Sequence, residues 1–156
     1  MAFPGTESVR IVPLGGLGEI GLNLMVIECG TSAIVIDAGV MFAEERALGV
    51  GQLAPDLRYL SSRQLKVEAI FLTHAHDDHI GALPHLLRNF PAPVYGTAVT
   101  LAFARRTLAE DGPDDADLRT LVPGREIEAG AFRIEAVRVT HSTPESDEWE
   151  ANQKVE

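Results

Sequence analysis

The sequence predicts an α/β fold built as one globular domain. Runs of β-branched and apolar residues end at glycines and other turn residues, which is typical of buried strands. After one of these runs, apolar residues recur at helical spacing, with Ile80, Leu83 and Leu87 among them. With 156 residues, of which 46% are apolar, the chain is long enough to bury one core.

The expected elements alternate along the chain. Residues 40–56 hold glycines, Pro55 and acidic residues without periodicity, so they predict a surface loop. Residues 57–65 predict a short helix or a turn, and a turn at Ala129 and Gly130 joins the last two strands into a hairpin. We expect helices from Ile80 onward and over residues 99–110, and strands over residues 9–14, 23–28, 33–37, 67–72, 93–96, 125–127 and 132–139.

Charge and composition narrow the class of protein. The balance of 13 basic against 23 acidic residues gives a net charge of −10, which disfavours a nucleic-acid-binding surface over the chain as a whole. Cys29 has no second cysteine to pair with, so it fits a buried thiol in a reducing compartment. The first ten residues lack a leader pattern, and no window approaches the ~18 apolar residues needed to span a bilayer. We therefore expect a cytoplasmic protein without a membrane segment.

The segment Thr73-His74-Ala75-His76-Asp77-Asp78-His79 predicts a metal site. Neutral imidazoles and carboxylates are ligands of divalent transition metals. His74 and His76 lie two residues apart, so both rings point to one side of an extended segment, while Asp78 and His79 follow where the chain turns. One segment is thus able to serve two neighbouring metals. The alternative is a polar turn between a strand and a helix.

Two residues elsewhere are candidates to join this cluster. Asp37 ends an apolar strand, where a carboxylate either binds a metal or orients a histidine ligand, although a turn or helix-capping role is the alternative. His141 directly follows the last predicted strand and is added to the cluster, although taken by itself it is an ordinary loop residue. His85 lies within the predicted helix and is interpreted as a surface or interhelical histidine.

The glycine-rich segment from Gly16 to Gly21 satisfies a dinucleotide-binding pattern, with Asp37 at about the required distance. That pattern requires a helix to begin within the glycines, yet residues 23–28 predict a strand. We therefore favour a structural loop whose glycines let the backbone come close to a neighbouring site.

Taken together, these motifs resemble the metallo-β-lactamase fold and, within its β-CASP branch, the ribonuclease J family. The resemblance covers nearly all of residues 9–146. It is carried by Leu14-Gly15-Gly16-Leu17-Gly18-Glu19-Ile20-Gly21-Leu22-Asn23, Ile36-Asp37-Ala38-Gly39, Pro55-Asp56, Thr73-His74-Ala75-His76-Asp77-Asp78-His79-Ile80-Gly81 and Thr140-His141-Ser142-Thr143-Pro144-Glu145-Ser146.

The resemblance implies the N-terminal half of an αββα four-layer sandwich and a zinc-dependent ribonuclease. Such an enzyme hydrolyses RNA in 5′ to 3′ exonucleolytic and endonucleolytic modes, so RNA is the implied partner. By the same resemblance, His74, His76 and His141 hold one zinc ion, Asp78 and His79 contribute to a second, and Asp37 supports the site. Two zinc ions ~3.5–4 Å apart activate a bridging water and stabilise the charge of an in-line displacement.

The chain also departs from the family pattern. Residues 1–146 correspond to the N-terminal part of the metallo-β-lactamase domain, and residues 147–156 form a polar tail without strand period. The tail makes the chain look truncated or frame-shifted, and the second zinc site keeps only two ligands. We expect at most one tightly held zinc, reduced nuclease activity, and an uncovered apolar sheet face that favours self-association or a complementing chain. A lactone or thioester hydrolase of the same fold and a non-catalytic zinc-binding or interaction fragment remain as alternatives.

Overall fold

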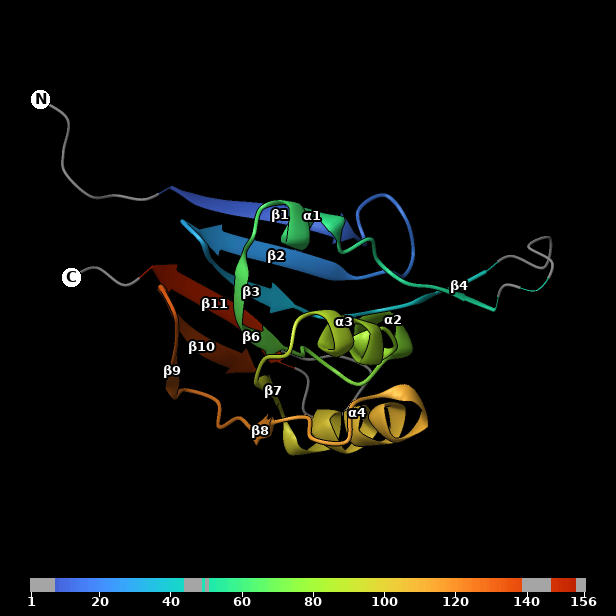
Figure 1. Cartoon of the computed structure of the whole chain (residues 1–156). Helices are drawn as coiled ribbons and strands as arrows, with labels where there is room; N and C mark the ends of the chain where they lie inside the picture. Colours follow the sequence, from blue (N-terminus) through green and yellow to red (C-terminus); the bar gives the residue numbers. More distant parts are fainter. Residues whose placement is uncertain (1–7, 44–48, 50, 139–146, 154–156) are drawn as a thin grey trace, which may run out of the picture.

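The structure is a computed structural model that describes residues 8–43, 49, 51–138 and 147–153. For residues 147–153 it describes the backbone alone. Its main sheet has six strands in the order β1-β2-β3-β6-β7-β8 (Figure 1). The first three pair antiparallel, and β3, β6, β7 and β8 are parallel neighbours. The strands are β1 (Val9–Gly15), β2 (Leu24–Cys29), β3 (Ser32–Ile36), β6 (Lys66–Phe71), β7 (Val94–Gly96) and β8 (Leu118–Thr120).

Helices and a second sheet cover the two faces of the main sheet. The second sheet has the order β11-β10-β9, and two further short strands, β4 and β5, pair with each other. These elements are α1 (Arg58–Ser62), α2 (Asp77–Ile80), α3 (Leu83–Asn89), α4 (Ala98–Asp111), β4 (Met41–Phe42), β5 (Gln52–Leu53), β9 (Glu126–Ala129), β10 (Phe132–Arg138) and β11 (Asp147–Gln153).

The alternation of side chains along the strands explains why both faces are buried. On β3, Ala33 and Val35 join the apolar cluster formed with the helices, whereas Ile34 between them joins the cluster formed with Phe132 and Ile134 of β10. Within the described residues the fold therefore has three layers, helix, sheet and sheet. This agrees with the predicted α/β sandwich class.

Most predicted elements are present, with four differences. The expected helix is divided into α2 and α3, which meet at Gly81 and Ala82. The expected loop over residues 40–56 contains the short pair β4 and β5, and β8 was not expected. The prediction that no strand follows residue 146 is wrong, because β11 pairs with β10 from Asp147 opposite Arg138 to Gln153 opposite Phe132. Pairing along a long neighbour compensates for a sequence without strand period.

The expected uncovered apolar face is reduced to one end of the main sheet. The second sheet buries Ile34 and Phe71, while Ile11 on the edge strand β1 remains 61% exposed. Cys29 is buried, as predicted. Among the described residues, none of the helices has the length and apolar character needed to cross a bilayer.

Candidate metal site

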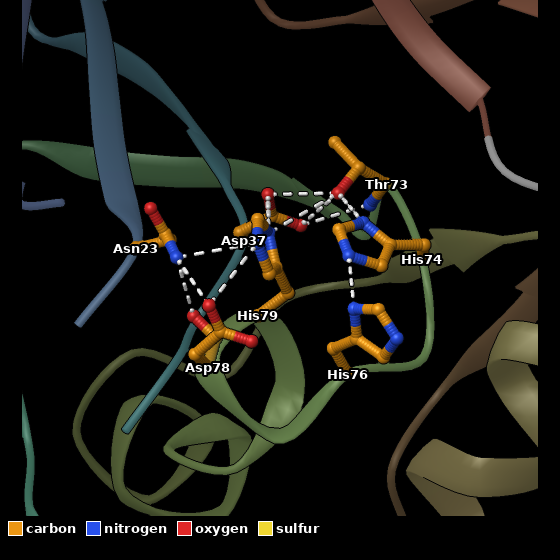
Figure 2. A network of polar contacts seen from close by, with 7 residues as sticks. All are labelled: Asn23, Asp37, Thr73, His74, His76, Asp78 and His79. Atoms are coloured by element: carbon orange, nitrogen blue, oxygen red, sulfur yellow. Dashed lines mark hydrogen bonds and ion pairs between the residues drawn. The ribbon is translucent and has the colours of Figure 1, made fainter. Parts of the chain in front are cut away.

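The candidate site lies at the edge of the main sheet where β3 and β6 end. These two strands are parallel neighbours, so their carboxyl ends meet at the same edge. Asp37 directly follows β3, and the histidine-rich segment directly follows β6. Figure 2 shows that the topology brings these two predicted groups together.

His74 and His76 face each other through their ring nitrogens. The Nε2 atom of His74 lies 3.0 Å from the Nδ1 atom of His76, and the ring centroids are 4.6 Å apart at 80°. His74 is buried and His76 is half-buried. The predicted placement of both rings on one side of the segment is therefore confirmed. Two converging imidazole nitrogens are a donor set that suits a divalent metal such as zinc.

Asp37 is the centre of the polar network behind these rings. Its side chain is buried, and its backbone adopts a left-handed conformation with φ of 61°. Its Oδ1 accepts hydrogen bonds from the backbone N–H of Thr73 at 2.8 Å and from the Thr73 hydroxyl at 3.0 Å. Its Oδ2 lies 2.9 Å from the same hydroxyl and 2.7 Å from Nδ1 of His79. Asp37 thus orients one histidine directly and contacts a second through Thr73.

Asp78 and His79 are held from the other side by Asn23. The Asn23 Nδ2 donates to the Asp78 carbonyl at 3.0 Å and to Asp78 Oδ2 at 3.1 Å, and it lies 3.2 Å from Nε2 of His79. Asp78 Oδ2 and His79 Nε2 are 3.6 Å apart. We did not predict a site role for Asn23, although it lies two residues after the glycine-rich segment that we expected to approach a site.

The chain that follows the glycine-rich segment contacts the site through the backbone of Asn23, and it continues into β2 rather than into a helix. The N–H of Asn23 donates to the Asp78 carbonyl at 3.2 Å, and its own carbonyl accepts from Gly39 N–H at 2.9 Å. A side chain at Gly16 would collide with Asn23, because a Cβ there would lie 2.4 Å from Asn23 Oδ1. These contacts confirm the structural interpretation of the glycines and contradict the dinucleotide pattern.

The environment of His79 changes its acidity. Burial by itself lowers the pKa of His79, but the hydrogen bond and negative charge of Asp37, with a smaller contribution from Asp78, outweigh burial and raise the pKa above its ordinary value. In the metal-free chain, protonated His79 paired with Asp37 therefore stabilises the fold at acid pH. That contribution is complete below the unfolded pKa of about 6.5 and is lost as pH rises through the higher folded value.

We expect an NMR titration of the metal-free chain to give a His79 pKa above about 6.5. The Asp37→Asn variant is expected to give a lower His79 pKa, because the neutral amide removes the largest favourable partner and leaves burial in place. Asp56→Asn is the matched control, because Asp56 pairs with Arg58 at the surface, so this variant should leave the His79 pKa at its wild-type value. A wild-type His79 pKa at or below its ordinary value would contradict this interpretation.

The two histidines outside this segment were predicted to have different roles. His141 lies outside the described residues, so its role as third ligand stays a prediction. His85 is half-buried on α3 and lines a groove with Arg88 and with Phe103 of α4, which agrees with an interhelical position. Among the described side chains, those of residues 8–43, 49 and 51–138, no three histidine, cysteine or acidic groups are placed to hold one ion.

Comparison with known proteins places the chain in a family. Residues 17–149 match the metallo-β-lactamase superfamily. The chain is 44% identical over 147 residues to ribonuclease J2 of Bacillus subtilis (strain 168), covering 94% of this chain and 26% of that protein. It is 45% identical over 148 residues to ribonuclease J of Helicobacter pylori (strain 26695), covering 94% of this chain and 22% of the relative. The chain thus spans about a quarter of the length of these relatives.

Solved structures show the same fold at low identity. The metallo-β-lactamase SMB-1, in a complex with mercaptoacetic acid, matches with a TM-score of 0.61 at 19% identity, over 90% of this chain and 57% of that chain. A protein of unknown function from Enterococcus faecalis V583 matches with a TM-score of 0.64 at 17% identity, over 93% and 41%. The chain belongs to the metallo-β-lactamase superfamily and, within it, is homologous to the N-terminal part of the ribonuclease J proteins.

Proposed function

We propose that this chain forms the metal-binding part of a zinc-dependent ribonuclease that hydrolyses RNA phosphodiester bonds. The observation that supports this most is the pair of ring nitrogens on His74 and His76, 3.0 Å apart at the end of β6. Homology to ribonuclease J proteins supports RNA as the substrate class. That this chain has such activity without any further part of the protein is also a proposal.

The proposed roles of the residues come from the resemblance to the ribonuclease J family, and the arrangement around Asp37 supports them. His74 and His76, with His141 as the proposed third ligand, hold one zinc ion, and Asp78 and His79 contribute to a second. Asp37 orients His79, and Asn23 restrains Asp78. A divalent metal, when bound, supplies Lewis-acid stabilisation of the charge that develops on a phosphate during hydrolysis.

The charge of the chain limits how it binds RNA. With a net charge of −10, the chain has no general attraction for a polyanion, so binding depends on the metal site and on any further part of the protein. The first site has three proposed ligands, the number typical of an open catalytic zinc, whereas the second has two. We therefore propose one tightly bound zinc and weak RNA cleavage by this chain by itself.

Zinc titration of the purified, chelator-treated chain is expected to give about one tight equivalent. His76→Ala should weaken binding by more than the roughly 10–100-fold that loss of an outer-shell partner costs, because it removes a ligand itself. The matched control is His85→Ala, which removes a histidine on α3 and should leave zinc affinity unchanged.

Cleavage of single-stranded RNA, with and without chelator, tests the substrate class beside a panel of lactones and thioesters. We expect weak, chelator-sensitive cleavage of RNA that is absent in His76→Ala. Hydrolysis of the small molecules without RNA cleavage would replace the ribonuclease by a small-molecule hydrolase. Zinc binding without any hydrolysis would favour a non-catalytic zinc-binding fragment.

A further inference from the structure

Thr73 stands between the buried carboxylate and the first histidine of the site. Its hydroxyl oxygen lies 3.0 and 2.9 Å from the two oxygens of Asp37 and 2.9 Å from Nδ1 of His74 (Figure 2). We propose that Thr73 is a positioning residue that keeps the proton of neutral His74 on Nδ1 and thereby directs the lone pair of Nε2 toward His76. The value of this orientation for metal binding rests on the proposed function.

The proton assignment follows from counting donors and acceptors. A carboxylate accepts hydrogen bonds and donates none, whereas a threonine hydroxyl has one proton to donate and two lone pairs. The contacts of 2.9–3.0 Å between the hydroxyl and Asp37 therefore take the hydroxyl proton. The hydroxyl then meets His74 only as an acceptor, so Nδ1 of His74 must carry the proton. In a neutral imidazole this leaves Nε2 unprotonated.

The unprotonated nitrogen is the one that points into the proposed site. Nε2 of His74 lies 3.0 Å from Nδ1 of His76, on the side of the ring away from Thr73. Metal-binding histidines commonly donate their other ring N–H to a carboxylate or another fixed acceptor, and the choice of that partner sets which nitrogen binds. Here the acceptor is the hydroxyl of Thr73. This hydroxyl is oriented by the carboxylate of Asp37, whose side chain is only 8% exposed.

The same carboxylate orients a second ring. The Nδ1–H of His79 donates to Asp37 Oδ2 at 2.7 Å, which leaves His79 Nε2 on the side of Asp78 and Asn23. The Thr73 hydroxyl lies farther from His79 Nδ1, at 3.4 Å, so its stronger contact is with His74. Asp37 therefore reaches His79 directly and His74 through Thr73, and Thr73→Val should alter the tautomer of His74 while leaving that of His79 unchanged.

The test is the tautomer of His74 in the metal-free chain, read from the ¹⁵N shifts of its ring at a pH where the ring is neutral. Wild type is expected to show a protonated Nδ1 and an unprotonated Nε2. Thr73→Ser should keep this pattern, because it keeps the hydroxyl. Thr73→Val, which has nearly the same shape without the hydroxyl, should show a mixture of tautomers at His74.

Zinc affinity gives a second readout on the same proteins. Thr73→Val is expected to weaken zinc binding about 10–100-fold, as loss of an outer-shell partner does, while Thr73→Ser stays within a few-fold of wild type. Thr107→Val is the matched control, because the hydroxyl of Thr107 contacts only the carbonyl of Phe103 on α4 among the contacts of the described residues. It should change neither readout.

A wild-type His74 with its proton on Nε2 would overturn the inference, whatever the variants do. So would a Thr73→Val variant with the wild-type tautomer and affinity, or a Thr73→Ser variant as impaired as Thr73→Val. If the wild-type chain binds no zinc, the proposed function fails, yet the tautomer of the metal-free ring still decides the role of Thr73.

Discussion

Replacement of Gly39 by alanine is expected to lower the free energy of unfolding by about 3 kcal/mol or more. A Cβ at this position would lie 1.5 Å from the carbonyl oxygen of Asp78 and 2.1 Å from its carbonyl carbon. Both are backbone atoms, so no side chain can move aside to make room. The segments around Gly39 and Asp78 must therefore move apart, and the contacts that hold them together are lost.

Those contacts are hydrogen bonds that define the site. The Gly39 N–H donates to the Asn23 carbonyl at 2.9 Å, and the preceding Ala38 N–H donates to the His79 carbonyl at 2.8 Å. Separation of the segments would leave several backbone N–H and carbonyl groups without hydrogen-bond partners in a partly buried place. Each unpaired group costs about 1–3 kcal/mol. It would also move His79 relative to Asp37, so zinc affinity should fall together with stability.

Chemical denaturation of wild type and variant, followed by circular dichroism, measures the effect. Gly51→Ala is the matched control, because a Cβ at Gly51 has open space around it. It should change the free energy of unfolding by no more than about 0.5 kcal/mol. A Gly39→Ala variant as stable as Gly51→Ala would show that the close approach of these two backbones is not needed.

The sequence was sufficient to predict that the segments with Asp37 and with Thr73 to His79 meet at one edge of the sheet. The strands before Asp37 and before Thr73 are apolar and bounded by turns, and their parallel pairing brings both ends to one edge. The sequence could not predict β8 or β11, because both depend on a neighbour to pair with rather than on their own side chains.

The contacts of Asn23 and Thr73 were also beyond sequence reasoning. Asn23 lies 55 residues from Asp78 in the chain, and its role arises because the chain just before β2 passes beside Gly39 and Asp78. Thr73 has an ordinary side chain next to a ligand motif, and its importance follows from where Asp37 places a carboxylate. Both are consequences of tertiary packing, which local patterns do not encode.

Replacement of Asp37 by alanine is expected to lower the free energy of unfolding by about 3–5 kcal/mol. The change removes the acceptor of three hydrogen bonds, from the N–H and the hydroxyl of Thr73 and from Nδ1 of His79. It also leaves alanine in a left-handed conformation, with φ of 61° in the wild-type chain, which costs roughly 1–2 kcal/mol for a residue with a Cβ.

The Asp37→Asn variant separates the contribution of the carboxylate to stability from the contribution of the left-handed backbone conformation. Asparagine tolerates the left-handed region and has nearly the same shape, so the backbone penalty largely disappears. Its amide offers one acceptor oxygen and one donor group in place of two acceptor oxygens. If the oxygen keeps the bonds from Thr73, the NH₂ faces Nδ1 of His79, which must then accept and carry its proton on Nε2.

The asparagine variant should therefore lose about 1–3 kcal/mol, less than alanine, and should reverse the tautomer of His79. Denaturation midpoints and ring ¹⁵N shifts check these two expectations. Asp56→Asn is the control, because Asp56 pairs with Arg58 on the surface and lies away from the site network, so it should leave the denaturation midpoint close to wild type and the His79 tautomer unchanged. Equal losses for asparagine and alanine, with the His79 tautomer unchanged, would mean that Asp37 only fills space. The predicted difference instead makes the carboxylate the group that decides which nitrogen of His79 faces Asp78.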